Sequence, residues 1–164
     1  MAQIVADSDR YAGIGADALL TEDVRTVIAE HGLGYVATVN SDGTPNLSPK
    51  ATMVVIDDRT LAFGDLRSPT TVSNLQDRPS LEINFVDVFR RKGFRLKGTA
   101  TYLPADDEGF ARWRAHFSAW GELVDHFRGI VVVSVERCLP LLSPAYDHGA
   151  SEAELVADWR RKYL

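Results

Sequence analysis

The chain has 164 residues, of which 45% are hydrophobic, and this length and composition fit one domain with its own core. Its formal net charge of -5 argues against general attraction to nucleic acid. A single cysteine excludes an intrachain disulfide, and neither a leader-like segment nor a long apolar run appears near the N-terminus. We therefore expect a cytoplasmic protein with no membrane partner.

The first forty residues predict an arm, a helix and a strand. Residues 1–20 have little periodicity, and we expect an N-terminal arm there. Thr21 is typical of a helix cap and Gly32 of the residue that follows a last turn, so a helix should lie between them. The apolar period then changes to two, which predicts a strand over residues 35–40.

A turn at residues 41–44 leads into a long second strand, predicted over residues 46–56. Pro49 lies inside it, and proline has no backbone N–H to donate to a neighbouring strand. This strand should therefore lie at an edge of the sheet or contain a bulge. A third strand is predicted over residues 60–64.

A short helix is predicted over residues 68–76, and its first residues suit a helix N-terminus. Ser68 is a favoured N-cap, and Pro69 fits the first helical position because its missing N–H would be unpaired there. The next two residues, Thr70 and Thr71, add hydroxyl groups beside the free amides. Taken alone, these residues could form an ordinary cap.

The residues around this helix start favour an anion. The free amides and the positive end of the helix dipole attract a phosphate group. Arg67 beside them and Lys50 on the preceding strand would add full positive charge. The sequence therefore predicts a ligand with a phosphate group, held where the strand meets the helix.

Two more strands, over residues 81–86 and 94–103, should form a hairpin joined through the basic loop at residues 90–92. Alternation along the second strand places Arg95 and Lys97 on the same face. The local positive charge indicates a site, although a charged hairpin loop can equally be a solvated turn.

The C-terminal part of the chain predicts two helices and a strand. Aromatic residues recur at three- and four-residue steps from 110 to 120, which predicts a helix over residues 104–120 with a buried stripe. A β-branched run predicts a strand at 130–135, and a capping box at 151–154 predicts a C-terminal helix over 151–164. Six strands with consecutive hairpins favour a mainly β fold, an antiparallel sheet curled into a barrel with flanking helices.

Other classes of site find little support in the sequence. The four histidines are scattered without metal-ligand spacing, so we assign no metal. No nucleophile elbow supports a Ser-His-Asp site. The run K-G-F at residues 92–94 has a faint likeness to an RNA-recognition strand, but Arg95 and Lys97 stand where that motif has small or aromatic residues. We therefore expect no nucleic-acid partner.

Several short runs, in the right order and spacing, resemble the pyridoxamine 5'-phosphate oxidase-like flavoproteins. They are G-Y-V-A-T-V at 34–39, D-G-T-P-N-L-S-P-K at 42–50, L-A-F-G-D at 61–65, R-S-P-T at 67–70 and K-G-T-A at 97–100. The tail S-P-A-Y at 143–146 is similar to the family's predicted flavin-nucleotide-binding branch. The resemblance implies a single domain over residues 1–164, a Greek-key-like split β-barrel that binds FMN at the interface of a homodimer.

The resemblance also implies the residues of the flavin site. They are Ser48, Lys50, Asp65, Arg67, Ser68, Thr70, Thr71, Asn74, Arg95 and Lys97. Thr70 and Thr71 stand where the oxidases proper carry an Arg-Lys pair, so neutralising the phosphate falls to the other cations of this set. Replacing Lys50 with methionine would test its place near the flavin.

The implied function is that of an FMN-binding oxidoreductase acting on a small molecule. FMN carries the hydride chemistry, so the protein needs to hold and tune the ring rather than supply an acid–base pair. The C-terminal run W-R-R-K-Y-L at 159–164 lacks the histidine pattern with which the oxidases proper grip pyridoxine phosphate, and we do not expect pyridoxal phosphate synthesis. Related split barrels hold the deazaflavin F420 or haem, and a non-catalytic flavin-binding protein is a further alternative.

Overall fold

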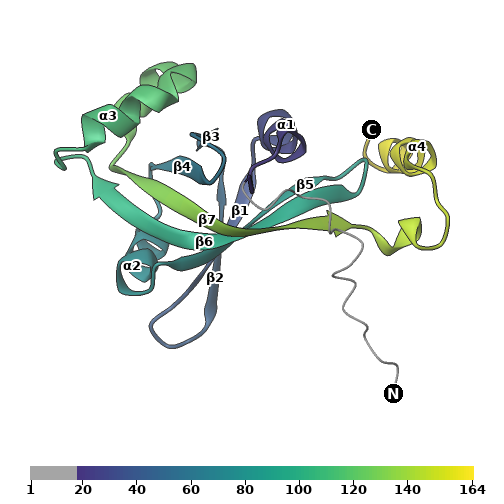
Figure 1. Cartoon of the computed structure of the whole chain (residues 1–164), viewed down its shortest axis with the longest axis horizontal. Coiled ribbons are helices and arrows are strands. Elements are labelled where there is room, and N and C mark those ends of the chain that lie inside the picture. Colours follow the sequence, from purple (N-terminus) through teal and green to yellow (C-terminus); the bar gives the residue numbers. More distant parts are fainter. Residues whose placement is uncertain (1–17) are drawn as a thin grey trace.

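The computed structural model describes residues 18–164, and the centre of the fold is one antiparallel sheet of seven strands (Figure 1). The strands are β1 (Gly34–Val39), β2 (Pro45–Lys50), β3 (Met53–Val55), β4 (Thr60–Asp65), β5 (Ser80–Asp87), β6 (Lys92–Pro104) and β7 (Gly129–Leu142). They pair in the order β2-β1-β5-β6-β7-β4-β3. The prediction of a mainly β fold with a curled antiparallel sheet is confirmed. Most of the predicted N-terminal arm lies outside the described residues.

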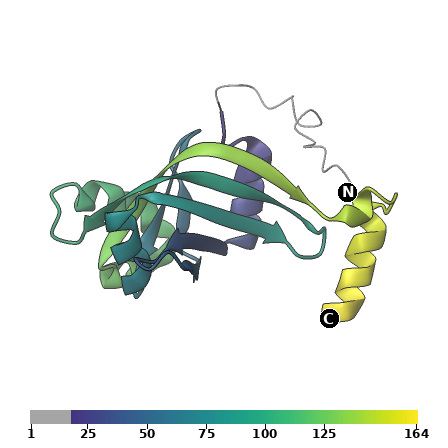
Figure 2. The same cartoon turned by 90° about the horizontal axis from the view of Figure 1, so that it is seen from below.

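Helical segments flank the sheet at several places. They are α1 (Glu22–His31), α2 (Pro69–Asp77), α3 (Phe110–Arg114), the 3-10 segment η2 (Ala115–His126), the 3-10 turn η3 (Pro144–Tyr146) and α4 (Glu152–Tyr163). Figure 1 shows α2 and α3 toward one end of the long strands β6 and β7, and α4 at the other end. Seen from below, α4 stands beyond the tip of the β5–β6 hairpin (Figure 2). The two ends of the molecule therefore carry different helices.

The strands β2 and β3 follow each other in the chain but form opposite edges of the sheet. Only Ala51 and Thr52 lie between them, and a connection of this length spans at most about 11 Å. The two edges must therefore meet, and the sheet must curl upon itself. We call this junction, residues 50–53 together with the end of β4, the seam.

The prediction of one long strand over residues 46–56 was wrong, because the chain changes its pairing partner at the seam. Residues before it pair with β1, and residues after it pair with β4. Pro49 lies in β2, which is an edge strand, as its missing donor predicted. Alternation within a single segment contains no information about such a change of partner.

Two apolar clusters fill the fold. The larger one joins the sheet to α1 and includes Val36, Ile83, Phe85 and Leu96, all 1% exposed or less. The second lies beneath α3 and η2 and is formed by Ala62, Phe117, Val124, Phe127 and Ile130. Gly64 lies against this second cluster, and a Cβ atom there would lie 2.2 Å from the Phe127 ring. A side chain at position 64 would therefore displace the ring.

The predicted helix over residues 104–120 was also wrong in its extent. The strand β6 continues to Pro104, α3 covers only five residues, and η2 is interrupted at Phe117 and Gly121. Gly121 has φ 52, a left-handed conformation that favours glycine. The aromatic stripe does pack inward, since Phe117 is fully buried and three other aromatic residues lie partly buried against the second cluster.

Other predicted elements are confirmed with small changes in their ends. The strand predicted at 130–135 lies in the first half of the longer β7, which pairs with β6 along its whole length around a bulge between Lys97 and Gly98. The hairpin of β5 and β6 forms as expected. The capping box of Ser151 and Glu154 is present at the start of α4.

Candidate functional site

A hollow of about 520 Å³ lies at the seam, beside the start of α2. We call it the seam pocket. Its polar lining is Ser48, Lys50, Thr52, Arg67 and Ser68, and its apolar lining includes Pro49, Ala51, Leu66, Trp120 and Leu123. Four of the predicted flavin residues, Ser48, Lys50, Arg67 and Ser68, thus come together in one pocket. Its size is within the range of small-ligand sites.

Lys50 is the last residue of β2 and is only 8% exposed. Its ammonium group donates to Ser48 Oγ and to the carbonyl oxygen of Pro49, the latter at 3.5 Å. Burial lowers the pKa of Lys50, and the negative charge of Asp65 opposes that effect. A desolvated ammonium group whose hydrogen-bond acceptors are neutral would be stabilised by a bound anion.

Asp65, the last residue of β4, fixes the turn that leads into α2. It is 4% exposed, and its Oδ1 accepts hydrogen bonds from the backbone N–H of Ser68, at 2.9 Å, and from the Ser68 hydroxyl. Ser68 does occupy the N-cap position and Pro69 the first helical position, as predicted. The expected cap by the Ser68 side chain is absent, however, because that hydroxyl binds Asp65 instead.

This arrangement leaves the start of α2 without a side-chain cap from Ser68. Amides in the first turn of a helix lack partners within the helix, and together with the helix dipole they attract an anion. Arg67 lies next to them, is exposed, and forms no ion pair within residues 18–164. The seam pocket therefore combines a helix N-terminus with one buried cation and one exposed cation.

Thr71 and Asn74 serve mainly to hold α2 on the sheet. Thr71 is 1% exposed and its hydroxyl accepts from Asn46 Nδ2 at 3.3 Å. Asn74 Nδ2 donates to Thr38 Oγ1 at 3.0 Å and to Asn40 Oδ1 at 2.9 Å. These contacts place the helix start at the seam, and direct ligand binding by either residue stays a prediction.

Thr70 lies outside the seam pocket. It is exposed and lines a separate polar hollow of about 540 Å³, together with Asn40, Asp42 and Ser73. The helix start lies between the two hollows, so a role for Thr70 in binding phosphate stays a prediction.

Arg95 and Lys97 lie on the opposite face of the sheet from Lys50. In the register of the sheet, Arg95 of β6 lies opposite Asn84 of β5, and Asn84 lies opposite Tyr35 of β1. These three side chains therefore belong to the outer face. Arg95 pairs with Glu82 at 3.5 Å. The shared face of the two cations is confirmed, but within one chain neither reaches the seam pocket.

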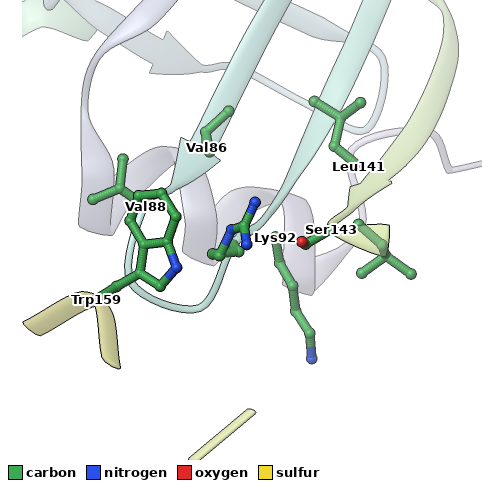
Figure 3. Close-up of a pocket in the computed structure, with 8 residues that line it drawn as sticks. Val86, Val88, Lys92, Leu141, Ser143 and Trp159 are labelled. Atoms are coloured by element: carbon green, nitrogen blue, oxygen red, sulfur yellow. The ribbon is translucent and has the colours of Figure 1, made fainter. Parts of the chain in front are cut away.

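The basic loop before β6 lies near α4 rather than near the seam pocket. The Arg91 guanidinium lies 4.5 Å from the centroid of the Trp159 ring, and Lys92 Nζ lies 2.6 Å from Glu152 Oε2. Arg91, Lys92 and Trp159 line a third hollow of about 250 Å³, together with Val86, Val88, Leu141, Leu142 and Ser143. Figure 3 shows Lys92 and Trp159 at this hollow. The positive charge of the loop thus helps to fix α4.

Sequence reasoning missed several residues of the seam pocket. Thr52 was taken as part of a continuous strand, and Trp120 as part of a buried stripe. Leu123 stood out in no pattern. Gly121 was a usable signal, because a glycine directly after the predicted helix is typical of a helix end, where the last side chain need not face the core.

Within residues 18–164, no three His, Cys, Asp or Glu side chains come together in a group that could hold a metal ion. No helix in the described part of the chain is both long and apolar enough to cross a membrane.

The curled antiparallel sheet, with a pocket at the junction of its two edges, defines a split β-barrel protein with a candidate anion site. The chain belongs to the pyridoxamine 5'-phosphate oxidase family, whose model matches residues 20–140. This family is the one that the sequence motifs indicated. No curated protein matches the chain.

Solved structures with the same fold include HupZ of Group A Streptococcus, which is 29% identical, with a TM-score of 0.65 over 75% of this chain and 94% of that one. A candidate pyridoxamine 5'-phosphate oxidase from Lactobacillus delbrueckii is 24% identical, with a TM-score of 0.61 over 73% of this chain and 93% of that one. An FMN-binding protein from Syntrophomonas wolfei is 17% identical, with a TM-score of 0.61 over 74% of this chain and 85% of that one. At these two lower identities the likeness shows the fold alone.

Proposed function

We propose that this chain binds FMN in the seam pocket and acts as an FMN-dependent oxidoreductase on a small molecule. The observation that carries the proposal is the position of Lys50, a buried cation with neutral hydrogen-bond acceptors, in one pocket with Arg67 and the start of α2. A phosphate group on a polar ring system would compensate this charge and fill the pocket. The protein of the same fold from Syntrophomonas wolfei is described as FMN-binding, which supports FMN as the ligand.

The residues of the pocket divide by their chemistry. Arg67 and the first amides of α2 would hold the phosphate, since both provide positive charge at the pocket edge. Lys50 and Ser48 would donate to polar atoms of the ring, and Leu66 would contact its apolar parts. FMN itself supplies the hydride chemistry when bound, and these side chains bind and orient it.

We also propose that the protein is a homodimer formed through the outer face of the sheet. Three large apolar side chains on β1 and β2, Tyr35, Val39 and Leu47, are 42%, 44% and 65% exposed there. The registers of β1, β2 and β5 place all three on the same face as Arg95 and Lys97. The seam pocket of the same chain lies on the other face from Arg95 and Lys97. A role of these two cations in a flavin site therefore requires a second subunit.

The dimer is tested by sedimentation of the wild type and of Leu47→Asp at micromolar concentration. We expect a dimer for the wild type and a monomer for the variant. A wild-type monomer that carries flavin would contradict the proposed interface and leave FMN binding intact.

The test of FMN binding is the absorption spectrum of the purified protein, followed by release of the coloured molecule with heat and measurement of its mass. Bands of oxidised flavin and the mass of FMN would support the proposal, and electron donors would be screened next. A deazaflavin spectrum or a Soret band would replace FMN with F420 or haem. A colourless protein that also ignores added FMN would overturn the proposal.

A further inference from the structure

The apolar part of the seam pocket comes from a distant segment of the chain. Trp120 and Leu123 belong to η2, whereas Lys50 is the last residue of β2 and Arg67 follows β4. We propose that Trp120 and Leu123 form a wall that determines the specificity of the pocket, by selecting ligands in which a planar aromatic ring carries an anionic tail. The inference rests on the proposed function, since it assigns the residues that recognise the ring of the ligand.

The local backbone explains why Trp120 reaches the pocket. In a continuous helix, Trp120 would lie on the same face as Phe117 and Val124, which are 0% and 6% exposed and belong to the second cluster. The segment is interrupted instead at Phe117, with φ -102, and at Gly121, with φ 52. Trp120 is consequently only partly buried and lines the seam pocket together with Leu123.

Trp120 is also held in place from behind. Its ring centroid lies 5.6 Å from that of Phe117, at an interplanar angle of 51°. Phe117 in turn meets Phe127 edge to face at 5.3 Å, and Phe127 packs against Gly64 at the end of β4. A ring supported in this way loses little conformational freedom when a ligand stacks on it.

The two kinds of lining act on different parts of a ligand. Arg67 and the first amides of α2 attract any phosphate, including inorganic phosphate and sugar phosphates. Burying the indole of Trp120 and the side chain of Leu123, which is 39% exposed, is favourable only against an apolar or aromatic surface. Arg67 and the helix start therefore supply affinity for the anion, and the wall supplies the preference for a planar ring.

The test compares two probes, FMN and ribose 5-phosphate, on the full chain. FMN binding is followed by flavin fluorescence, and ribose 5-phosphate by its competition with FMN. The variants are Trp120→Ala, Trp120→Phe and Leu123→Ala, with Trp113→Phe as the matched control. Trp113 packs partly buried against the second cluster and does not line the seam pocket. Because Leu123 is exposed, its truncation tests the wall without disturbing the core.

We expect Trp120→Ala to weaken FMN binding at least about fivefold, the lower end of what the loss of one aromatic stack on a base costs. Leu123→Ala should also weaken it, whereas Trp120→Phe and Trp113→Phe should bind nearly as the wild type does. The affinity for ribose 5-phosphate should stay the same in all four variants.

Three results would overturn the inference. Unchanged FMN binding in both Trp120→Ala and Leu123→Ala would refute the wall and leave the proposed function intact. An equal loss for both probes would show that the variants disturb the whole pocket rather than the recognition of the ring. A wild type that does not bind FMN would remove the proposed function and, with it, this inference.

Discussion

Thr52 and Gly64 exchange two hydrogen bonds at the seam of the barrel. Thr52 Oγ1 donates to the carbonyl oxygen of Gly64 at 2.9 Å, and the N–H of Gly64 donates to the carbonyl oxygen of Thr52 at 3.2 Å. Thr52 is 5% exposed, so the hydroxyl bond is shielded from water. Together these bonds hold the connection between β2 and β3 against β4, where the seam pocket lies.

Replacing Thr52 with valine should destabilise the protein by about 1–2 kcal/mol, because the shape is kept while a buried hydrogen bond is lost. Urea unfolding at equilibrium measures this change. Thr101→Val on β6 is the matched control, since Thr101 is exposed, and it should have little effect. An equal loss in the two variants would show that the Thr52 hydroxyl bond is unimportant.

Gly64→Ala should destabilise the protein by about 1–3 kcal/mol through overpacking. The new Cβ atom would lie 2.2 Å from atoms of the Phe127 ring, so the ring has to move. The same substitution in a Phe127→Leu background should cost less, because leucine lacks the obstructing ring. A cost that does not depend on residue 127 would contradict the predicted clash.

Arg67→Gln should weaken FMN binding by about tenfold or more, as expected for the loss of a hydrogen bond between charged groups. The effect should shrink at high salt, because Arg67 is exposed and its charge is screened. Arg78→Gln at the other end of α2 removes the same charge and serves as the control. Flavin fluorescence titrations measure the FMN affinity of both variants. An equal loss of affinity in the two would mean that only the net charge of the protein matters.

Lys50→Met should change how stability depends on pH. Because burial lowers the pKa of Lys50 below its ordinary value of 10.5, the unfolded chain binds this proton more tightly than the folded chain does. Between the lowered pKa and 10.5, the free energy of unfolding contributed by Lys50 therefore rises with pH. Below that window the folded protein carries the full desolvation cost of the charge.

Without ligand, the methionine variant should thus be more stable than the wild type at neutral pH, and the difference should shrink as the pH rises toward 10.5. Urea unfolding of both proteins across this range measures it. The variant should also bind FMN more weakly, and an unchanged FMN affinity together with an unchanged reduction potential would remove Lys50 from the flavin site.

Cys138 should be unreactive in the folded protein. It is 8% exposed, and burial raises the pKa of its thiol from 9.0 to about 11. This difference reduces the thiolate about 100-fold relative to an ordinary cysteine at the same pH. Labelling with iodoacetamide should be very slow in buffer and fast in concentrated urea. Rapid labelling of the folded chain would show that β7 opens readily around this residue.

Much of the fold could be predicted from the sequence where a pattern is local. The alternation at residues 35–40 gave β1 almost to the residue, and the capping box at Ser151 gave the start of α4. The seam could not be found in this way, since Pro49 indicates an edge but not which strand comes next to it. The change of pairing partner at Ala51 depends on contacts far apart in the sequence.

Part of the candidate site was also predictable, because it lies on local sequence motifs. Ser48, Lys50, Arg67 and Ser68 lie on segments whose motifs are continuous, and the structure brings them into one pocket. Trp120 follows a spacing that is typical of a buried helix face, and the interruptions at Phe117 and Gly121 turn it toward the pocket. The hydroxyl of Ser68 binds Asp65 because that carboxylate is buried and needs hydrogen-bond donors. N-cap preferences describe only the start of a helix, so they could not predict this partner.

The connection of two residues between β2 and β3 has a consequence for the order of folding. The chain itself keeps the ends of these strands close, whereas the sheet that connects them around the barrel exists only when β1, β5, β6, β7 and β4 have paired. Completing the barrel around the seam therefore depends on nonlocal strand pairing, of the kind that slows folding. A ligand that binds at Lys50 recognises only the finished barrel, so it stabilises the native state over every partly folded form.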